Sequence, residues 1–438
     1  MSSASDTIYS LSSGGLPSGV AVLRVSGPSA STVCDVLCGG PVPPRVAALR
    51  TIRSRNGEII DQGLVLSFPG PASFTGEDCV ELQVHGGRAV VERLLDELGT
   101  FPHFRHAEAG EFSRRAFAQG KLDLVEIEGL ADLISAETEM QRRLASEHAR
   151  GGVSQIYQGW AKRLTHARAM IEAELDFADE DDVPGSVSAA IWRDMEHLSR
   201  EISDHLAGAR TGAIIRHGYR IVISGPPNAG KSSLLNALAK QDIAIVTDIA
   251  GTTRDVLSVD ISLAGFVVKL FDTAGLRETD DLVEREGIRR AKALQDEADL
   301  ILCLSDAPHG FMLPDEGETE ILRVATKIDI SPELWDRTAA DVLVSVETPQ
   351  GLEALISAIT ERLPDSAAAD SFSVPSRRRH GDHLTQCLAA LNEAAKSADL
   401  DLQSEQLRRA SDALGRITGR IDVEDLLDVI FSEFCIGK

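Results

Sequence analysis

Gly-Pro-Pro-Asn-Ala-Gly-Lys-Ser, at positions 225–232, is the stretch that decides the fold. It lies between a strand-like apolar run at 220–224 and a helix-like run at 233–239. A phosphate-binding P-loop requires this strand–loop–helix context, and the context disfavours a glycine-rich turn that matches by chance. The glycines allow backbone N–H groups to point at an anion where the helix begins, while Lys231 can reach the outer phosphates and Ser232 can ligate Mg²⁺. The stretch therefore predicts a nucleoside triphosphate site.

Two later elements have the order and spacing of the switch regions of G proteins. A Gly-Thr-Thr-Arg-Asp run begins at Gly251, and Thr253 within it can complete the Mg²⁺ shell. Strand-like runs at 256–263 and 266–271, joined by Ala-Gly, predict a hairpin that ends at Asp272. The Asp272 carboxylate can hold Mg²⁺ through a water molecule.

Two further elements indicate that the base is guanine. Thr-Lys-Ile-Asp, at 326–329, ends a strand in the base-reading position. The Asp329 carboxylate can accept the paired N–H donors of guanine, an arrangement that adenine does not present. Ser-Val-Glu, at 345–347, follows another strand and would close the base pocket. One such element is weak evidence, but all of them in this order favour a guanine nucleotide.

The residue after the second switch motif points to the mechanism of hydrolysis. Leu276 stands where many small GTPases have the glutamine that orients the attacking water, and leucine cannot do this. Another group must therefore orient the water, and transition-state charge must be neutralised without an evident arginine finger. The Asn228 side-chain carbonyl could hold a monovalent cation beside the β- and γ-phosphates, or it could simply bond within the loop.

Composition limits the class of protein and its partners. The 438 residues suggest about three domains, and 43% hydrophobic content with 26% charge is typical of a globular protein. The formal net charge of −24 argues against general binding to nucleic acid or anionic membranes. The six cysteines form no C-x-x-C pair, so we expect neither a zinc site nor disulfides. No signal peptide or membrane span is evident, and a cytoplasmic location is expected.

The succession of elements predicts three domains, with the middle one discontinuous. Residues 6–120 indicate an α+β region, and residues 121–217 a helical region. Strand and helix then alternate from 219 to 370, and 376–432 is helical again. Because two helical regions flank an α/β unit, we expect that unit to be inserted into one helical domain. The clearest strands of the first region are 20–25, 63–68 and 80–85.

Five further runs carry a family resemblance. They are Phe-Thr-Gly-Glu-Asp at 74–78, His-Gly-Gly at 85–87, Gly-Glu-Phe-Ser-Arg-Arg-Ala-Phe at 110–117, Gly-Lys-Leu-Asp-Leu at 120–124 and Cys-Ile-Gly-Lys at 435–438. With these runs the chain resembles the MnmE (TrmE) family, GTPases that act in the modification of tRNA wobble uridines. The resemblance extends from Asp6 to the last residue, and few families combine an inserted G domain with this terminal tetrapeptide.

The resemblance implies a domain plan and partners. The plan is a tetrahydrofolate-binding-like and dimerisation domain at 1–119, a helical domain at 120–215 and 373–438, and an inserted Ras-like P-loop G domain at 216–372. It implies a homodimer that joins the FAD protein MnmG in a heterotetrameric complex. Together they would add a carboxymethylaminomethyl or aminomethyl group to carbon 5 of the tRNA wobble uridine, with a tetrahydrofolate derivative as one-carbon donor. The rival is a regulatory GTPase switch in ribosome or RNA assembly, which normally carries a basic RNA-binding appendage that is not evident here.

The resemblance also assigns folate-site residues. By position, Arg24, Glu81, Lys121 and Lys438 match residues that hold the folate, and their charges suit a glutamate tail and a pterin ring. Without the family, each would be interpreted as a surface ion pair. Cys435 would lie at the folate and uridine site as a nucleophile or general acid/base, while its structural alternative is a small buried residue.

For the G domain the resemblance implies that K⁺ replaces the arginine finger when two G domains meet. Asn228 and the backbone carbonyls of Thr247, Ile249 and Thr252 would hold K⁺, and Glu284 would orient the water in place of Leu276. Ser232 and Thr253 would ligate Mg²⁺, with Asp272 acting through water, and Lys231 would contribute to catalysis. The GTP-binding set is then Asn228, Ala229, Gly230, Lys231, Ser232, Ser233, Thr247, Asp248, Ile249, Ala250, Gly251, Thr252, Thr253, Asp272, Thr273, Ala274, Gly275, Thr326, Lys327, Asp329, Ser345, Val346 and Glu347.

Several features depart from the family pattern or stay open. Thr326 stands where G proteins usually have asparagine, so a bond that ties the base to the P-loop is expected to weaken, while Asp329 keeps the preference for guanine. Only about 15 residues connect the strands near 305 and 321, so one helix is expected to be short or missing. The loop at 10–18 differs from the usual glycine-rich one. The acidic run at 179–182 favours a solvated loop over a metal site, and the basic run at 377–380 is either a solvated helix face or a tRNA or partner contact.

Overall fold

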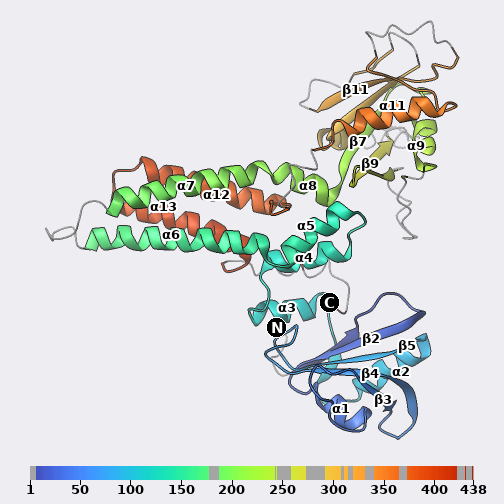
Figure 1. The fold of residues 1–438 in the computed structure, drawn as a ribbon, viewed down its shortest axis with the longest axis vertical. Helices are drawn as coiled ribbons and strands as arrows, with labels where there is room; N and C mark the ends of the chain where they lie inside the picture. The colour runs from blue at the N-terminus through green and yellow to red at the C-terminus, as the bar shows by residue number, and fades with distance from the viewer. Residues whose placement is uncertain are drawn as a thin grey trace, which may run out of the picture. The chain divides into compact units, whose positions relative to one another are not determined.

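The computed structural model describes residues 6–176, 187–241, 243, 258–272, 292–306, 310–313, 319–330, 340–364, 372–421, 430 and 437. The chain divides into two compact units, each built from segments that are distant in sequence. Unit 1 is Met1–Ala131, His148–Leu175 and Asp399–Lys438, and unit 2 is Asp132–Glu147 and Asp176–Ala398. Figure 1 shows the elements of each unit. In the part of the chain that the structure describes, no helix is long and apolar enough to cross a membrane.

Unit 1 contains a six-stranded sheet, here called the first sheet, in the order β3-β4-β5-β2-β1-β6. All neighbouring strands are antiparallel except β1 and β6, which are parallel. The expected strands at 20–25, 63–68 and 80–85 are confirmed as parts of β2, β4 and β5. The strands are β1 (Thr7–Leu11), β2 (Ser18–Ser26), β3 (Ala48–Arg53), β4 (Ile59–Phe68), β5 (Cys79–Gly86) and β6 (Phe104–His106). The helices are α1 (Thr32–Leu37), α2 (Arg88–Gly99) and α3 (Glu111–Ala118).

The alternation of side chains in β2 divides the first sheet into two faces. Leu23 and Val25 are fully buried in the core formed with α1 and α2. Helix α2 covers this face through Leu94 and Leu98, which are four residues apart and therefore lie on one side of the helix. Arg24, between the two buried residues, points to the opposite face. The second face is thus the place where charged side chains of β2 and β5 gather.

The helices that follow α3 are separated by a break that the sequence did not indicate. Helix α4 (Leu124–Ile134) begins at Asp123, whose carboxylate accepts from the Glu126 N–H at 3.0 Å while Glu126 accepts from the Asp123 N–H at 2.7 Å. Helix α5 (Glu139–Ala149) begins anew because Gln141 accepts the N–H of Thr138 at 3.1 Å. The helical region expected before Gly151 is therefore divided into two helices.

Two longer helices complete unit 1. They are α6 (Gly152–Asp176) and α13 (Leu400–Thr418), and Ser404 Oγ of α13 donates to Glu172 Oε1 of α6 at 3.0 Å. Helix α13 begins at Asp399, whose side chain accepts two backbone N–H groups, and it ends at Gly419 with φ of 81°.

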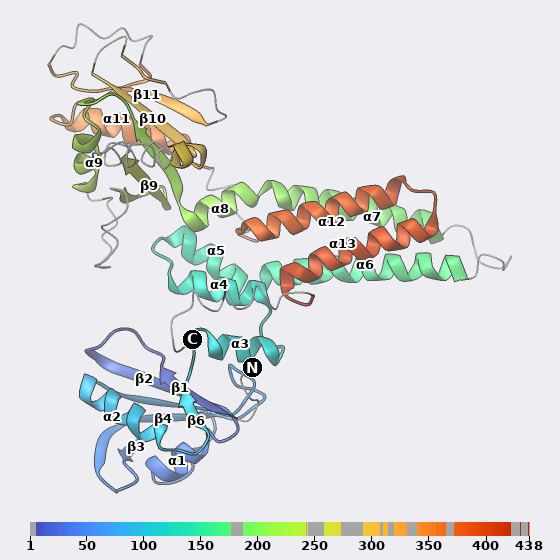
Figure 2. The ribbon, with the colours of Figure 1, turned by 180° about the vertical axis from the view of Figure 1, so that it is seen from behind.

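In unit 2, three helices lead into and out of a second sheet. They are α7 (Val187–Ala207), α8 (Ala209–His217) and α12 (Arg378–Lys396); α7 and α12 lie side by side in both views (Figures 1 and 2). Helix α8 ends at Gly218 with φ of 91°. The chain enters the sheet after α8 and returns before α12, and Asp132 accepts from Arg216 Nε and Arg377 Nη2, both at 3.0 Å. The Asp132 carboxylate thus binds one arginine just before the chain enters the sheet and one just after it returns.

The second sheet has six strands in the order β12-β11-β10-β7-β9-β8. Its neighbours are parallel except β8 and β9, which form the predicted hairpin, with Ala264 and Gly265 at φ of 50° and 85° in the turn. In the connection from β10 to β11, the described residues 306, 310–313 and 319 form no helix. The strands are β7 (Tyr219–Ser224), β8 (Ser258–Leu263), β9 (Phe266–Asp272), β10 (Leu300–Ser305), β11 (Glu320–Ala325) and β12 (Val342–Leu343), with helices α9 (Lys231–Ala239) and α11 (Pro349–Thr360).

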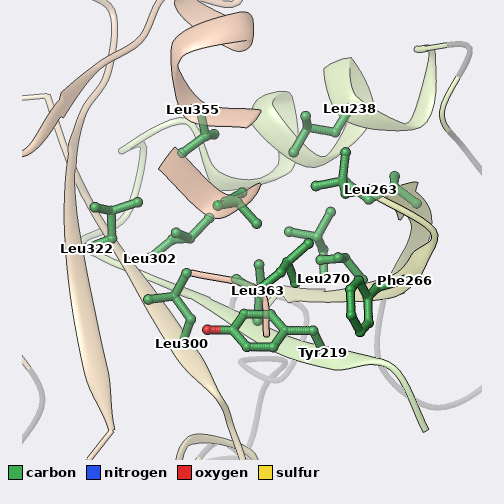
Figure 3. Packing of buried hydrophobic residues seen from close by; sticks show 14 of the residues in the cluster. Tyr219, Leu238, Leu263, Phe266, Leu270, Leu300, Leu302, Leu322, Leu355 and Leu363 are labelled. Carbon is green, nitrogen blue, oxygen red and sulfur yellow. The ribbon is translucent and has the colours of Figure 1, made fainter. Parts of the chain in front are cut away.

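Helices α9 and α11 contribute to the hydrophobic core of this sheet. Leu238 of α9 and Leu355 of α11 are buried with Leu302 and Leu270 of the central strands (Figure 3). All six residues of β10 are buried, as expected for a parallel strand covered on both faces. Because β7, β10, β11 and β12 run in the same direction, the loops after their carboxyl ends meet at one edge of the sheet.

Candidate functional site

The P-loop joins β7 to α9, as predicted. Gly225 has φ of 147°, and a Cβ placed there would lie 2.4 Å from the carbonyl oxygen of Leu304, so only glycine fits. Gly230 has φ of 86° and precedes the first residue of α9. The largely buried Lys231 folds back over the loop, where its Nζ donates to the carbonyls of Gly225 at 2.9 Å and Pro226 at 2.8 Å. The lysine therefore lies within the loop that it is expected to serve.

The structure brings together two of the three predicted Mg²⁺ residues. Ser232 Oγ, at the N-terminus of α9, donates to Asp272 Oδ2, at the end of β9, at 2.8 Å. Asp272 is fully buried. A hydroxyl and a carboxylate at a helix N-terminus are oxygen donors of the kind that Mg²⁺ takes, so this pair fits the ion. The third residue, Thr253, lies outside the described residues.

The base-reading loop contacts the P-loop directly. Thr326 is buried, and its Oγ1 donates to the carbonyl of Ala229 at 2.8 Å. Lys327 Nζ donates to the carbonyl of Asn228 at 2.7 Å and to Asp306 Oδ2 at 2.9 Å. The threonine that stands in place of asparagine thus links its own loop to the P-loop, and the expected weakening of the bond to the base stays a prediction.

The other predicted base-pocket residues lie at the same edge of the sheet. Asp329 is exposed just beyond β11, and Ser345, just beyond β12, is buried. Ser345 Oγ accepts the N–H of Glu347 at 3.2 Å, which holds the turn after β12. Val346 and Glu347 are exposed. The edge therefore brings together the glycine-bounded loop 225–230, the Ser232–Asp272 oxygen pair and a loop with an exposed carboxylate.

Several predicted residues fall outside the part of the chain that the structure describes. They are Thr247, Asp248, Ile249, Ala250, Gly251, Thr252, Thr253, Thr273, Ala274, Gly275, Leu276, Glu284, Cys435 and Lys438. The acidic run at 179–182 lies outside it as well. Their assignments stay predictions.

The second face of the first sheet carries two of the predicted folate residues. Arg24 and Glu81 are directly opposite on β2 and β5, and Arg24 Nε and Nη2 both lie 3.0 Å from Glu81 Oε1. The guanidinium carbon lies 5.3 Å from the centre of the Phe74 ring and 5.6 Å from that of Phe112, so both rings can stabilise its charge. Lys121 Nζ donates to the carbonyl of Pro71 at 2.9 Å, at the start of the loop that carries Phe74.

Beside this pair lies a buried ionic network that the sequence interpretation missed. Arg115 donates to Glu77 Oε2 at 3.0 Å and to Glu111 Oε1 at 3.1 Å, and Arg105 Nη2 donates to Glu111 Oε1 at 2.6 Å. Ser26 Oγ of β2 donates to the same Glu77 oxygen at 3.1 Å. Glu77, Glu111 and Arg115 lie within the runs 74–78 and 110–117 and Arg105 lies on β6, but nothing in their spacing indicates the pairing of Arg115 with Glu77 across 38 residues.

The network determines the ionisation of Glu111. Burial alone would raise the pKa of this carboxyl, but hydrogen bonds from Arg105, from the Glu108 N–H and from Arg115, together with the charge of Arg105, outweigh burial. The pKa of Glu111 therefore lies below its ordinary value, and the carboxylate stays charged in the interior.

The described cysteines have no features of reactive thiols. Cys34, Cys38, Cys79, Cys303 and Cys387 are free and buried. Burial raises the pKa of Cys387 to about 12, which leaves it protonated and unreactive at neutral pH. Among the described residues, no group of three or more His, Cys, Asp or Glu side chains could hold a metal ion.

Comparison with known proteins decides the family. A family model for the N-terminus of the GTP-binding protein TrmE matches residues 7–121, and one for the MnmE helical domain matches residues 124–435. The tRNA modification GTPase MnmE of Rhizobium meliloti (strain 1021) is 65% identical over 437 residues, 99% of each chain. The chain belongs to the MnmE family of tRNA modification GTPases. A second member, from Rhizobium johnstonii, is 58% identical over 442 residues and covers 100% of both chains.

The MnmE relationship covers the chain from end to end and is not confined to one domain. The match to the helical-domain model spans residues 124–435, and all strands of the second sheet lie within that range. Among solved structures, the G domain of the T. maritima FeoB iron transporter is 26% identical, covering 33% of this chain and 98% of that chain, with a TM-score of 0.26.

Proposed function

We propose that this GTPase hydrolyses GTP in a K⁺-dependent reaction and, with the FAD protein MnmG, adds a carboxymethylaminomethyl or aminomethyl group to carbon 5 of the tRNA wobble uridine. A tetrahydrofolate derivative would supply the one-carbon unit. The observation that carries the proposal is the edge of the second sheet, where a P-loop lysine, the Ser232–Asp272 pair and the base-reading loop meet. Relatives with 58–65% identity over the whole chain are named tRNA modification GTPases, which supports the choice of substrate.

The proposed domains are 1–119 for folate binding and dimerisation, 120–215 and 373–438 for the helical domain, and 216–372 for the G domain. The family models, which meet between residues 121 and 124, support the first boundary. The end of α8 at His217 and the start of α12 at Arg378 support the other two.

In the proposed hydrolysis, this chain's own residues bind and orient the triphosphate. Lys231 would exchange its two loop carbonyls for phosphate oxygens, since an anion in the loop is a stronger partner for an ammonium group than a carbonyl. Ser232 and Asp272 would hold Mg²⁺, which neutralises phosphate charge when bound, and Asp329 would accept the N–H groups of guanine. Glu284 is proposed to orient the attacking water.

The proposed K⁺ ligand Asn228 fits an alkali ion in type and position. Its side chain is exposed on the P-loop, and its φ of 65° places it in the left-handed region. An amide oxygen in this position can coordinate a cation that supplies positive charge beside the β- and γ-phosphates. The backbone carbonyls of Thr247, Ile249 and Thr252 are proposed to complete the site.

The Arg24–Glu81 pair supports a folate site on the second face of the first sheet. The guanidinium can bind the carboxylates of a glutamate tail, and the Glu81 carboxylate can accept N–H groups of a pterin ring. Lys121 and Lys438 are proposed to contribute further positive charge, and Cys435 is proposed to act at the same site. The neighbouring rings Phe74 and Phe112 offer apolar surface for a flat ligand.

Homodimerisation is proposed to use the exposed apolar residues of the first sheet. Leu49 of the edge strand β3 and Leu64 of β4 are opposite each other and 61% and 38% exposed, and Ile59 is 59% exposed. Burying such a patch against a second copy would remove apolar surface from water.

The basic run at 377–380 is proposed to contact tRNA. The side chain of Arg378 in this run is 95% exposed, whereas Arg377 is bound by Asp132. A cytoplasmic location follows from these partners.

Two measurements, one on the full chain and one on cellular tRNA, test the proposal. GTP hydrolysis by the full chain is compared in K⁺ and in Na⁺ at equal ionic strength, and the tRNA of a deletion strain is analysed for its wobble uridines. We expect strong stimulation by K⁺ and loss of the modified uridine from the deletion strain. Equal rates in both salts together with unchanged uridines would refute the proposal and favour a regulatory switch.

A further inference from the structure

Two consecutive residues of the base-reading loop bind two consecutive carbonyls of the P-loop. Thr326 Oγ1 donates to the Ala229 carbonyl at 2.8 Å, and Lys327 Nζ donates to the Asn228 carbonyl at 2.7 Å. These residues are about 100 positions apart in sequence, at separations of 97 and 99. The base-reading loop therefore holds the segment that carries the proposed cation ligand.

The threonine bond is directed at the P-loop. A hydroxyl has one hydrogen, and Thr326 Oγ1 has two carbonyls within reach: Ala229 at 2.8 Å and Ser305 at 3.2 Å. The Ser305 carbonyl already accepts the Thr326 backbone N–H at 2.8 Å. The side-chain hydrogen is therefore best used by the Ala229 carbonyl, which is the nearer of the two.

The backbone on both sides of this contact has a conformation that requires support. Asn228 and Lys327 have φ of 65° and 55°, in the left-handed region. Asparagine tolerates this region, whereas lysine rarely adopts it. Lys327 is held there by bonds of its ammonium group to the Asn228 carbonyl and to Asp306 Oδ2. The left-handed conformation of Lys327 is thus supported in part by the P-loop, and the same bond fixes the carbonyl of Asn228.

We propose that Thr326 and Lys327 are positioning residues that hold Asn228 in the backbone conformation presenting its amide to the monovalent cation. The inference rests on the proposed role of Asn228 as a K⁺ ligand. It adds that guanine recognition and cation binding are coupled, because Asp329 belongs to the same loop as Thr326. Binding of the base would order this loop and, through two carbonyls, the cation ligand.

The test uses the full chain and three variants. Thr326→Val keeps the shape of the side chain but removes the donor, Thr326→Ser restores the hydroxyl, and Ile330→Ala changes a 71% exposed residue of the same loop as a control. The first readout is the K⁺ concentration that gives half-maximal formation of the complex of fluorescent GDP with aluminium fluoride. The second is the rate of fluorescent GDP release in Na⁺ alone.

We expect Thr326→Val to raise the half-maximal K⁺ concentration about fivefold, as the loss of one buried hydrogen bond allows. Thr326→Ser should lie within about twofold of the parent chain, and Ile330→Ala should not differ from it. Faster GDP release by Thr326→Val with an unchanged K⁺ requirement would overturn the inference, since the threonine would then serve the base alone. If the parent chain forms the complex equally in Na⁺ and K⁺, the proposed K⁺ site itself is refuted, and this inference with it.

Discussion

The two sheets of this protein have the same number of strands and place their candidate sites in opposite ways. In the second sheet the site lies on loops after the carboxyl ends of parallel strands. In the first sheet it lies on a face, where Arg24 of β2 and Glu81 of β5 are opposite each other in an antiparallel ladder. A loop-end site requires glycines and left-handed residues in a fixed order, whereas a face site requires only the correct register.

The difference teaches which interactions each site depends on. The P-loop site is supported by its backbone, and Lys231, which donates to two loop carbonyls, is proposed to turn to the ligand. The face site is supported by the buried network of Arg115, Glu77 and Glu111, which holds the loop and the helix around it. Substitutions in the second sheet should therefore affect chemistry, and substitutions in the first should affect stability before they affect binding.

The largest effect is expected at the loop-end site. Lys231→Ala removes the cation that is expected to bind the outer phosphates, and kcat/KM for GTP should fall on the order of 10³-fold. Steady-state hydrolysis assays measure this, with Lys240→Ala as the matched control because that lysine is exposed at the end of the same helix. A loss smaller than tenfold would mean that the loop does not act as a P-loop.

The next effect concerns the stability of the face site. Arg115→Met removes the guanidinium partner of Glu77 and one of the two that bind Glu111, which keeps Arg105, and the free energy of opening β2 and β5 should fall by about 3 kcal/mol. Hydrogen exchange of the amides in these strands measures this. Arg142→Met is the control, since it breaks a solvent-exposed pair with Glu139 that contributes little to stability. Equal effects of the two variants would contradict the distinction between the sheets.

Folate binding should respond less strongly. Arg24→Gln removes one charged partner of the ligand but leaves the ring surfaces in place, so the Kd for a reduced folate should rise about tenfold. Titration calorimetry on the full chain provides the value. Arg53→Gln, on the edge strand β3, changes an exposed arginine whose bond stays within its own turn, and it should leave the Kd unchanged. If Arg24→Gln also binds folate normally, the ligand does not use this face.

The smallest effect is a dependence of stability on pH. Because the pKa of Glu111 in the folded chain lies below its unfolded value of about 4.3, the unfolded state takes up the proton first as the pH falls. The contribution of Glu111 is therefore complete above the unfolded pKa and is lost as the pH drops towards the folded pKa. Glu111→Gln should flatten this decline in hydrogen-exchange measurements between pH 6 and roughly pH 3.5. An unchanged slope would show that other carboxyls cause it.

The loop site of the second sheet could be predicted from the sequence, whereas the face site of the first sheet could not. The P-loop, the hairpin to Asp272 and the base-reading loop were predicted from sequence, since glycines and charged residues at fixed spacing are needed wherever phosphate is bound on a loop. Arg24 and Glu81 were found only through family resemblance, because their 57-residue separation carries no signal of register. The Arg115 network and the break between α4 and α5 were missed for the same reason: each depends on partners that only the folded chain brings together.

The contact of Asp132 with Arg216 and Arg377 has a consequence for how such a chain can change over time. A segment of more than 150 residues leaves and re-enters the helices at points within the reach of one carboxylate. Its loss or replacement would require only a short bridge between those two points, with the helices on either side keeping their paths. The nucleotide-binding part is thus a module whose two ends meet at one carboxylate, and its exchange between proteins would also have to replace the contacts that Met140 and Leu144 of α5 make with its core.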